Sequence, residues 1–376
     1  MQAFSPECGS YRAEADSFDI PYKSKLCMTL SHRETSSVQR GTRESAPPTR
    51  SRRAPINLRA NLALIVLAVM ASGFQLFGLA ALLHAQGPWV VLMMVPVVVL
   101  TPTHWGLIHE GIHSQLFASR RWNEAIARTL SIALAVPFET VRFGHLMHHR
   151  FTREPYDQPD MHAGAGPLWR ARLVYYFRLL GGLYIGELVV PLLAFTPARF
   201  ASTQFANAVG EGGVCGEQIQ RHFVNFAGDA TRRSRTRRDW LITLALYGLA
   251  FWYYGAWWPV LAGIMLMRGI WISMADNLPH YDVELDEPGR ARNFKAPLFW
   301  RVVTMNHHLH LLHHEHPTLP WSALPAYAQQ VAELQTDPEQ ATTIPSRYRA
   351  STWYFRAAAR QFGGPRRVSG IPRGNP

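Results

Sequence analysis

Histidines at helical spacing are the residues of this chain with the clearest chemical meaning. The stretch 306–317, which reads NHHLHLLHHEHP, holds six of the 17 histidines. Two shorter stretches precede it: HEGIH at 109–113 and HLMHH at 145–149. Residues three or four apart share one face of an α-helix, so each stretch can direct its imidazoles to one place. The candidate ligands are His109, His113, His145, His148, His149, His310, His313 and His314.

These residue types predict a metal site without naming the metal. Neutral imidazole binds zinc, copper, iron and nickel alike, and eight imidazoles exceed what one ion takes, so the number favours two ions. The alternatives are ordinary core or surface histidines, or a histidine-rich tract that chelates metal adventitiously. Three separate boxes, two of them with the spacing H-x-x-H-H, favour a built metal site over both alternatives.

Charge and cysteine content exclude several other classes of protein. The chain has 376 residues and a net charge of +12, and its arginines border long apolar blocks. Basic residues in that position are typical of membrane proteins, where they face the anionic cytoplasmic leaflet. No aromatic residues alternate with the basic run 232–238, which argues against a nucleic-acid surface. The three cysteines form no CxxC pair and predict neither a disulfide framework nor a cysteine metal site.

Long apolar runs predict an all-α integral membrane protein with four transmembrane helices arranged as two hairpins. A helix needs about 20 residues to cross the hydrocarbon core of a bilayer. The hairpin turns at 86–88 and 257–259 carry no Lys or Arg, which favours the side of the membrane away from the cytoplasm. The expected spans are 61–85, 89–108, 240–258 and 260–278.

A further apolar segment, 173–197, is long enough to cross, but it contains Arg178, Glu187, a glycine pair and Pro191. Charges at membrane depth are costly. All three histidine boxes must reach one site, and so they have to lie on one side of the membrane. One additional crossing between boxes two and three would separate them. We therefore expect this segment to be re-entrant or interfacial.

This topology predicts a cytoplasmic helical cap that carries the three histidine boxes, with both termini on the same side. The expected location is the inner membrane of a bacterium. We expect the catalytic domain over 58–340, between a disordered basic N-terminal tail at 1–57 and a basic C-terminal tail at 341–376.

The boxes HEGIH, HLMHH and HLLHH, in this order, resemble those of the membrane-bound fatty acid desaturase superfamily. The stretches RFGH at 142–145 and HPTLPW at 316–321 are also similar to its bacterial members. The resemblance covers about residues 60–325. Because the superfamily also contains carotenoid hydroxylases, carotenoid ketolases and alkane hydroxylases, the boxes alone do not select one reaction.

The resemblance implies a centre of two non-haem iron ions that uses O2 to attack an unactivated aliphatic chain. It implies that the eight box histidines are iron ligands and that His280, just after the last expected span, is a ninth. Ligating imidazoles are usually oriented by carboxylates or carbonyls behind them. Candidates for this role are Asp276, Asn306, Glu110, Asp157 and Glu315, with Asp160, His307, His308 and His316 as further polar neighbours.

Two reactions remain open for such a centre. One is desaturation of an aliphatic chain, by default a fatty acyl lipid, although a small secondary metabolite with a saturated carbon pair would use the same boxes. The other is hydroxylation or ketolation of a carotenoid or an alkane. A metal transporter is the alternative outside this family. It would place its ligands at mid-membrane depth, and it is disfavoured because the boxes flank the spans.

The expected partners are the lipid bilayer and an electron donor. The sequence shows no fused electron-transfer segment, so we expect electrons from a separate ferredoxin-like or cytochrome b5-like protein. The basic run 232–238 is a candidate docking surface for an acidic donor, and binding to the membrane surface explains this run equally well.

Overall fold

The computed structural model describes residues 54–162, 166–283, 287, 289–336 and 350–367, all of which belong to one compact unit. The predicted N-terminal tail, 1–57, lies almost wholly outside the described residues. Of the predicted C-terminal tail, 341–376, the structure describes 350–367.

The first two long helical stretches reverse direction at Gly87. The Asn57 side chain caps the start of the first stretch by accepting a hydrogen bond from the Ala60 N–H at 3.1 Å. Gly87 has φ 85°, a conformation that glycine adopts without steric cost, and it ends the first stretch. The first stretch consists of α1 (Leu58–Gly73), the π-helical turn η1 (Phe74–Gly78) and α2 (Leu79–Gln86). The second consists of η2 (Pro88–Met94), α3 (Val95–Val99) and α4 (Thr101–Ile112).

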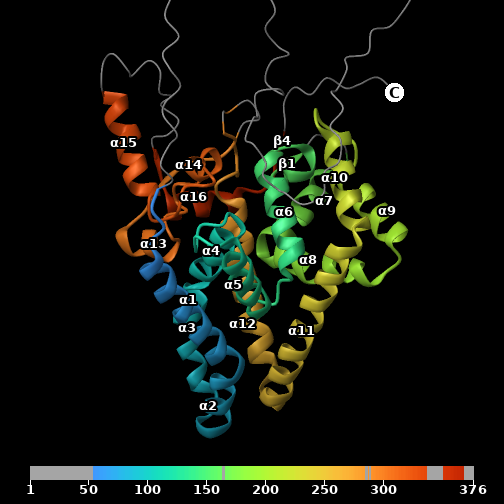
Figure 1. Cartoon of the computed structure of the whole chain (residues 1–376), viewed down its shortest axis with the longest axis vertical. Helices are drawn as coiled ribbons and strands as arrows, with labels where there is room; N and C mark the ends of the chain where they lie inside the picture. The colour runs from blue at the N-terminus through green and yellow to red at the C-terminus, as the bar shows by residue number, and fades with distance from the viewer. Residues whose placement is uncertain (1–53, 163–165, 284–286, 288, 337–349, 368–376) are drawn as a thin grey trace, which may run out of the picture. The chain divides into compact units, whose positions relative to one another are not determined.

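A second pair of long helices, α11 (Ala230–Tyr254) and α12 (Trp258–Asn277), is joined by the short turn η6 (Gly255–Trp257). Figure 1 shows this turn at the same end of the structure as α2. The histidine-bearing helices α6 (Phe138–Arg150) and α14 (His310–Glu315) lie toward the opposite end. Each of the two helix pairs therefore ends toward the histidine-bearing end. Box one lies at the end of α4, and the chain that follows α12 leads to box three.

Shorter helices and strands make up the rest of the described chain, which is mostly helical as the sequence predicts. Two short parallel strand pairs join distant segments: β1 (Met161–His162) with β4 (Arg366–Arg367), and β2 (Phe294–Lys295) with β3 (Thr352–Trp353). The remaining helices and helical turns are α5 (Arg120–Ala133), η3 (Pro155–Asp157), α7 (Leu168–Phe177), η4 (Arg178–Gly182), α8 (Leu183–Val189), η5 (Val190–Phe195), α9 (Ala198–Val209), α10 (Gly216–Gly228), α13 (Leu298–Val303), α15 (Leu324–Thr336), α16 (Tyr354–Arg360) and η8 (Gln361–Gly363).

Four helical stretches of the described chain have the length and apolar composition to cross a membrane: Leu58–Gln86, Pro88–Ile112, Leu168–Phe195 and Ala230–Asn277. The last is 48 residues long because it combines α11 and α12. These stretches contain all four spans that the sequence predicts, and they add Leu168–Phe195. That stretch is broken at Gly181, which has φ 110°. Its re-entrant path stays a prediction.

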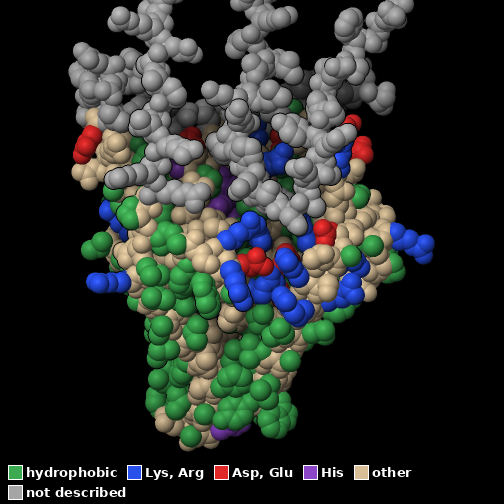
Figure 2. Space-filling view, viewed as in Figure 1, with side chains coloured by type: hydrophobic (Ala, Val, Ile, Leu, Met, Phe, Trp, Pro, Cys, Tyr) green, Lys and Arg blue, Asp and Glu red, His purple; other side chains and the backbone are tan. Residues whose placement is uncertain are grey.

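The surface of the long helices is apolar. Hydrophobic side chains cover the part formed by α1, α2, α11 and α12, and Lys and Arg side chains gather beyond it toward the histidine-bearing end (Figure 2). Examples of exposed apolar side chains are Val66, Met70, Leu92, Leu244 and Trp252. An apolar surface of this extent is typical of a protein that is in contact with lipid rather than water.

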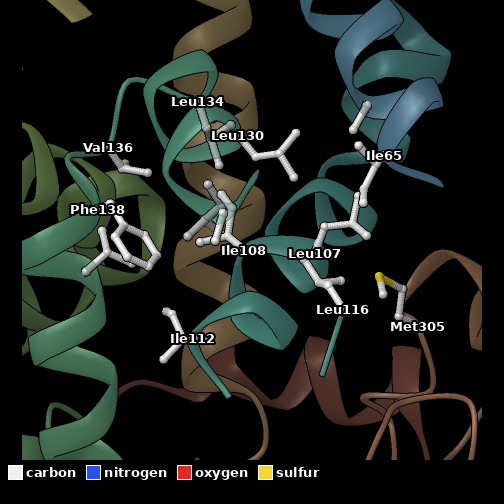
Figure 3. Close-up of a cluster of buried hydrophobic side chains, with 14 of the residues drawn as sticks. Ile65, Leu107, Ile108, Ile112, Leu116, Leu130, Leu134, Val136, Phe138 and Met305 are labelled. Carbon is white, nitrogen blue, oxygen red and sulfur yellow. The ribbon is translucent and has the colours of Figure 1, made fainter. Parts of the chain in front are cut away.

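An apolar core between α4 and α5 positions the first histidine box. Leu107 on α4 and Leu130 on α5 are fully buried in this core (Figure 3). A Cβ atom on Gly111 would lie 2.5 Å from Cβ of Ala127, so only glycine lets the two helices approach this closely. The close packing fixes the last turn of α4, where His109 lies.

A buried polar cluster around Arg268 lies among the long helices. The Arg268 guanidinium donates to the Thr101 hydroxyl at 3.2 Å, to the Gln75 side-chain oxygen at 2.5 Å and to Nδ1 of His104 at 2.9 Å. His104 in turn donates from Nε2 to the Leu130 carbonyl at 2.9 Å. The cluster therefore links α12, α4, η1 and α5 through neutral acceptors.

Residues 350–367 fold against the helical unit, which differs from the tail that the sequence predicts there. The Tyr175 hydroxyl donates to the Gln361 carbonyl at 2.7 Å, and the Tyr281 hydroxyl donates to the Gly364 carbonyl at 2.9 Å. The Asn277 side chain donates to the Gln361 side-chain oxygen at 2.7 Å. The basic composition of this stretch conceals its packing, because its buried residues are few and widely spaced.

Candidate metal centre

The three histidine boxes lie on three helices that come together at one end of the structure. Box one closes α4, where His109 is in the last turn and His113 is the C-cap residue. Box two occupies the second half of α6, and box three forms α14. His280 follows the end of α12 and joins them.

Nine histidines form two groups in which one ring nitrogen of each residue lies within 4.8 Å of those of the others. The first group is His109, His113, His145, His149 and His313. The second group is His148, His280, His310 and His314. The structure thus brings together every histidine that the boxes and the resemblance indicate.

The nitrogen spacing in the first group fits a shared cation. Nε2 of His113 lies 2.9 Å from Nε2 of His145, and Nε2 of His149 lies 3.1 Å from Nε2 of His313. Two imidazoles at right angles on one ion, each about 2.1 Å from it, have nitrogens about 3.0 Å apart. The observed distances agree with that geometry.

The nitrogens of the second group also have the spacing of ligands on a shared cation, and hydrogen bonds to two of its rings show which ring nitrogen is unprotonated. Nδ1 of His280 lies 2.8 Å from the Arg290 carbonyl oxygen, so it carries the proton and leaves Nε2 bare. Nδ1 of His148 lies 2.8 Å from the Asp157 carboxylate, which has the same effect. The Nε2 atoms of His148 and His280 are 3.1 Å apart, and His310 Nε2 lies 3.1 Å from that of His280. Lone pairs that face each other repel, and a metal ion between them resolves this conflict.

Burial keeps the first group in the form that binds metal. Both ring nitrogens of His109 and Nδ1 of His149 and of His313 are buried without a hydrogen-bond partner among the described residues. Burial, helped by His307, lowers the pKa of His113 to about 3. Burial and neighbouring imidazoles also hold the pKa of His149 and His313 well below the ordinary value. Neutral imidazole is the ligating species, so this environment favours coordination.

His148 differs from the other ligands because of Asp157. Burial disfavours a charged imidazole, but the adjacent carboxylate outweighs burial and raises the pKa of His148. Burial also opposes the charge on Asp157, and His148 outweighs it and lowers the pKa of that carboxyl. A carboxylate on Nδ1 fixes the ring and makes Nε2 a stronger metal ligand.

Glu110 and Asn306 lie on the other side of the centre. The Glu110 carboxylate is 3.7 Å from Nδ1 of His109 and 3.4 Å from Nε2 of His307, and it accepts from the Trp321 N–H at 3.0 Å. The Asn306 side chain donates to the Trp321 carbonyl at 3.1 Å. Together with His109, Glu110 and His307 form a third set of potential metal ligands. From the sequence, His307 is expected only as a polar neighbour of the ligands.

The remaining predicted polar neighbours have contacts with residues outside the two groups. Asp276 lies 3.4 Å from Arg178 in an ion pair. Glu315 ends α14 and partly opposes the burial that lowers the pKa of His316. The His316 ring lies 2.8 Å from the Tyr327 hydroxyl. The second neighbouring histidine, His308, is buried within the loop before α14.

A buried ion pair between Arg153 and Asp160 joins box two to the segment after α12. Arg153 also donates to the Val283 carbonyl at 3.1 Å, and Asp160 accepts from the Asp282 N–H at 2.9 Å. The pair therefore holds the chain after α6 beside the chain that carries His280. Asp160 supports the geometry of the centre without touching an imidazole, which differs from its predicted place.

A cavity opens beside the two histidine groups. His109, His145, His148 and His310 form its polar wall. The other walls are mostly apolar and aromatic, and they include Trp105, Trp271, Ile272, Phe294 and Tyr354. Cavities of this composition bind small or chain-like apolar ligands, so an apolar ligand in this cavity would lie next to the candidate metal ligands.

The backbone group that orients His280 could not be predicted from the sequence. The Arg290 carbonyl that orients His280 is a backbone group, which any residue type would supply. Its position depends on the path of the chain after α12, and local residue patterns do not encode that path. The Asp157 contact was accessible to sequence reasoning because an acidic residue follows box two at a short distance.

Comparison with known proteins gives a consistent result. Residues 88–348 match the family model described as fatty acid desaturase. The chain is also similar to two fatty acid conjugases of Calendula officinalis, FAC2 B and FAC2 A, with 25% identity over 234 and 235 residues. Each alignment covers 57% of this chain and 60% of the relative, so the chain matches about three fifths of the length of these relatives.

Proposed function

We propose that this chain, which belongs to the fatty acid desaturase family, introduces a double bond into an aliphatic chain at a di-iron centre with O2 as co-substrate. The observation that carries this proposal is the pair of converging imidazole groups in the wall of an apolar, aromatic cavity. The family membership makes the chain an oxidoreductase. The metal, the substrate and the exact reaction are the proposed parts.

The proposed iron ligands are the two groups of histidines described above, with one group for each iron. One iron would be held by His109, His113, His145, His149 and His313, and the other by His148, His280, His310 and His314. Iron fits this donor set because imidazole nitrogens at ligand spacing accept it, and because zinc, which imidazole also binds, cannot carry out redox chemistry. The bound irons would supply O2 activation next to the cavity.

The reaction has a defined balance. A saturated –CH2–CH2– pair, O2, two electrons and two protons give –CH=CH– and two molecules of water. The electrons come from a separate donor protein, ferredoxin-like or cytochrome b5-like. A fatty acyl chain is the default substrate, because the related conjugases act on fatty acids by their names and the cavity is apolar. A small secondary metabolite with a saturated carbon pair is the alternative substrate.

One experiment tests metal and reaction together. The purified protein should contain about two irons per chain, and cells that express it should accumulate dehydrogenated lipid, identified by mass spectrometry. Stoichiometric zinc without iron in active protein would contradict the metal assignment. Oxygenated products in place of dehydrogenated ones would identify a hydroxylase or ketolase and contradict the proposed reaction.

The proposed topology has two hairpins and a cytoplasmic cap. One hairpin runs from α1 to α4 and the other from α11 to α12, with both hairpin turns on the far side of the membrane. Leu168–Phe195 enters and leaves on the cytoplasmic face. The location of Lys and Arg near the histidine-bearing end supports this orientation (Figure 2).

Single cysteines and a membrane-impermeant thiol reagent test this topology in intact cells. The native cysteines are first replaced by serine, and one cysteine is then placed at Gln86, Ser202 or Arg235. Labelling from outside only at Gln86 agrees with the proposal. Labelling at Ser202 or at Arg235 would mean that Leu168–Phe195 or the second hairpin has a different path.

A further inference from the structure

One residue that lines the cavity beside the histidines lies outside the part of the chain that matches the family model. The family match ends at residue 348, whereas Tyr354 lines the cavity. We propose that Tyr354 is a specificity-determining residue whose ring restricts the cavity to straight, unbranched aliphatic chains. This inference rests on the proposed function, because it names the shape of the substrate that the same site accepts.

The segment that carries Tyr354 is fixed in place at both ends. Before it, Thr352 and Trp353 form β3, which pairs with Phe294 and Lys295 of β2. After it, Gln361 is fully buried, and its side-chain and backbone oxygens accept hydrogen bonds, both of 2.7 Å. A wall that is held on both sides cannot move aside at low cost when a wider ligand enters.

The Tyr354 side chain is itself held by other rings. It is 7% exposed, and its ring centroid lies 5.9 Å from that of Phe294 and 5.5 Å from that of Trp300. The Phe294 and Trp300 planes make angles of 82° and 61° with it, which are edge-on arrangements. Aromatic pairs of this kind prefer their geometry by about 0.5–1.5 kcal/mol beyond their burial. The ring is therefore a rigid part of the wall.

Other aromatic rings make the restriction effective. Trp105 and Trp271 line the same cavity as Tyr354, and so do His148 and His310 of the second histidine group. A linear methylene chain can lie between flat aromatic walls, but a methyl branch needs additional width. Hydrophobic sites discriminate by about 10–200-fold for one methyl or methylene group.

The neighbouring residue provides a matched control. Phe355 is on the same helix, α16, and its ring contacts Trp300 at 5.1 Å, but it is 52% exposed. It does not line the cavity. Replacing Phe355 by alanine removes an aromatic ring from the same helix without opening the cavity.

The experiment compares Tyr354→Ala, Tyr354→Leu and Phe355→Ala with the wild type in full-length protein. Cells receive equal amounts of hexadecanoic acid and a methyl-branched isomer, and the ratio of the two desaturated products is measured. In parallel, purified protein in lipid nanodiscs is titrated with each acid, and the acid concentration that gives half of the full thermal stabilisation is compared. The second measurement requires no turnover.

We expect Tyr354→Ala and Tyr354→Leu to reduce the preference for the straight chain by about 10-fold or more in both measurements. Phe355→Ala should retain the wild-type preference. An unchanged preference in Tyr354→Leu, with iron content and melting temperature near wild type, would overturn the inference. Absence of any desaturated product from the wild type would overturn the proposed function, and the thermal titration would still decide the role of Tyr354.

Discussion

Two of the buried polar clusters in the described part of the chain differ in how their polar atoms are satisfied. Around Arg268, donors meet acceptors: its guanidinium bonds to Gln75, Thr101 and His104 at 2.5–3.2 Å. In the histidine cluster, nitrogens face nitrogens at 2.9–3.1 Å, and both ring nitrogens of His109 lack a partner among the described residues.

The difference shows which cluster awaits a ligand. A buried polar atom without a partner costs about 1–3 kcal/mol, so a group of such atoms points to something that binds there. The Arg268 cluster is complete within the protein, and we interpret it as a structural link between helices. A bound metal ion would complete the histidine cluster.

The largest expected effect comes from removing a ligand. His148→Ala and His313→Ala should lose activity below detection and should purify with less iron, because each removes a coordinating nitrogen from a different group. His84→Ala is the control, since His84 is exposed and bonds to the Tyr253 carbonyl. Near-normal activity and iron content in both ligand variants would contradict the interpretation of the histidine cluster as the metal site.

Acid should destabilise the metal-free protein. The pKa of His113 and of His280 is lowered by burial to about 3 in the folded state, against an ordinary value of 6.5. Between these values the unfolded chain binds more protons, so stability falls as the pH falls from about 6.5 to about 3. Each group contributes a slope of about 1.4 kcal/mol per pH unit. The raised pKa of His148 acts in the opposite direction.

Chemical denaturation of metal-free protein at pH 7.5 and pH 5.5 measures this effect. His113 and His280 together predict a loss of about 3 kcal/mol; the other imidazoles with lowered pKa increase this loss, and the raised pKa of His148 reduces it. Iron-loaded protein should be less sensitive, because bound metal keeps the imidazoles deprotonated. Equal stability of the metal-free protein at both pH values would mean that the imidazoles are more exposed to water than the structure shows.

Breaking the Arg268 cluster should affect stability more than chemistry. Arg268→Met removes three hydrogen bonds at about 0.6 kcal/mol each in a membrane protein, so a loss of about 2 kcal/mol is expected. Adding Gln75→Leu should restore part of it, since the Gln75 side chain no longer lacks its partner. Unfolding in detergent measures both, with the exposed Arg199→Met as control. A large loss of iron in Arg268→Met would contradict the interpretation of the Arg268 cluster as a purely structural link.

The smallest expected effect concerns the carboxylate behind His148. Asp157→Asn keeps the shape but removes the charge on the imidazole, and iron affinity should fall by about 10-fold. Competition with a chelator gives the affinity. Asp229→Asn, at the half-exposed start of α11, should leave the affinity unchanged because asparagine also caps helices. Equal affinities in the two variants would show that Asp157 does not tune the metal.

The eight box histidines could be predicted because the helical repeat aligns the side chains within each box, whereas His280 was indicated only by the resemblance. His113 and His145, for example, belong to boxes whose spacing is visible in the sequence. The Arg268 cluster could not be predicted, since Gln75 and Arg268 are 193 residues apart and meet only through helix packing. The apolar runs indicated where the long helices lie, although α11 begins at Ala230, ahead of the predicted span 240–258, because its first turns are basic. The path of Leu168–Phe195 depends on the membrane and on neighbouring helices, which composition does not specify.

The cavity wall supplied by Tyr354 has a consequence for biosynthesis. A ribosome makes residues 350–367 only after it has made all nine histidines of the two groups. Folding during synthesis proceeds from the N-terminal side, so the helices that carry the histidines emerge before the segment that carries Tyr354. The order of synthesis therefore places the metal-binding side chains ahead of the wall that narrows the cavity beside them.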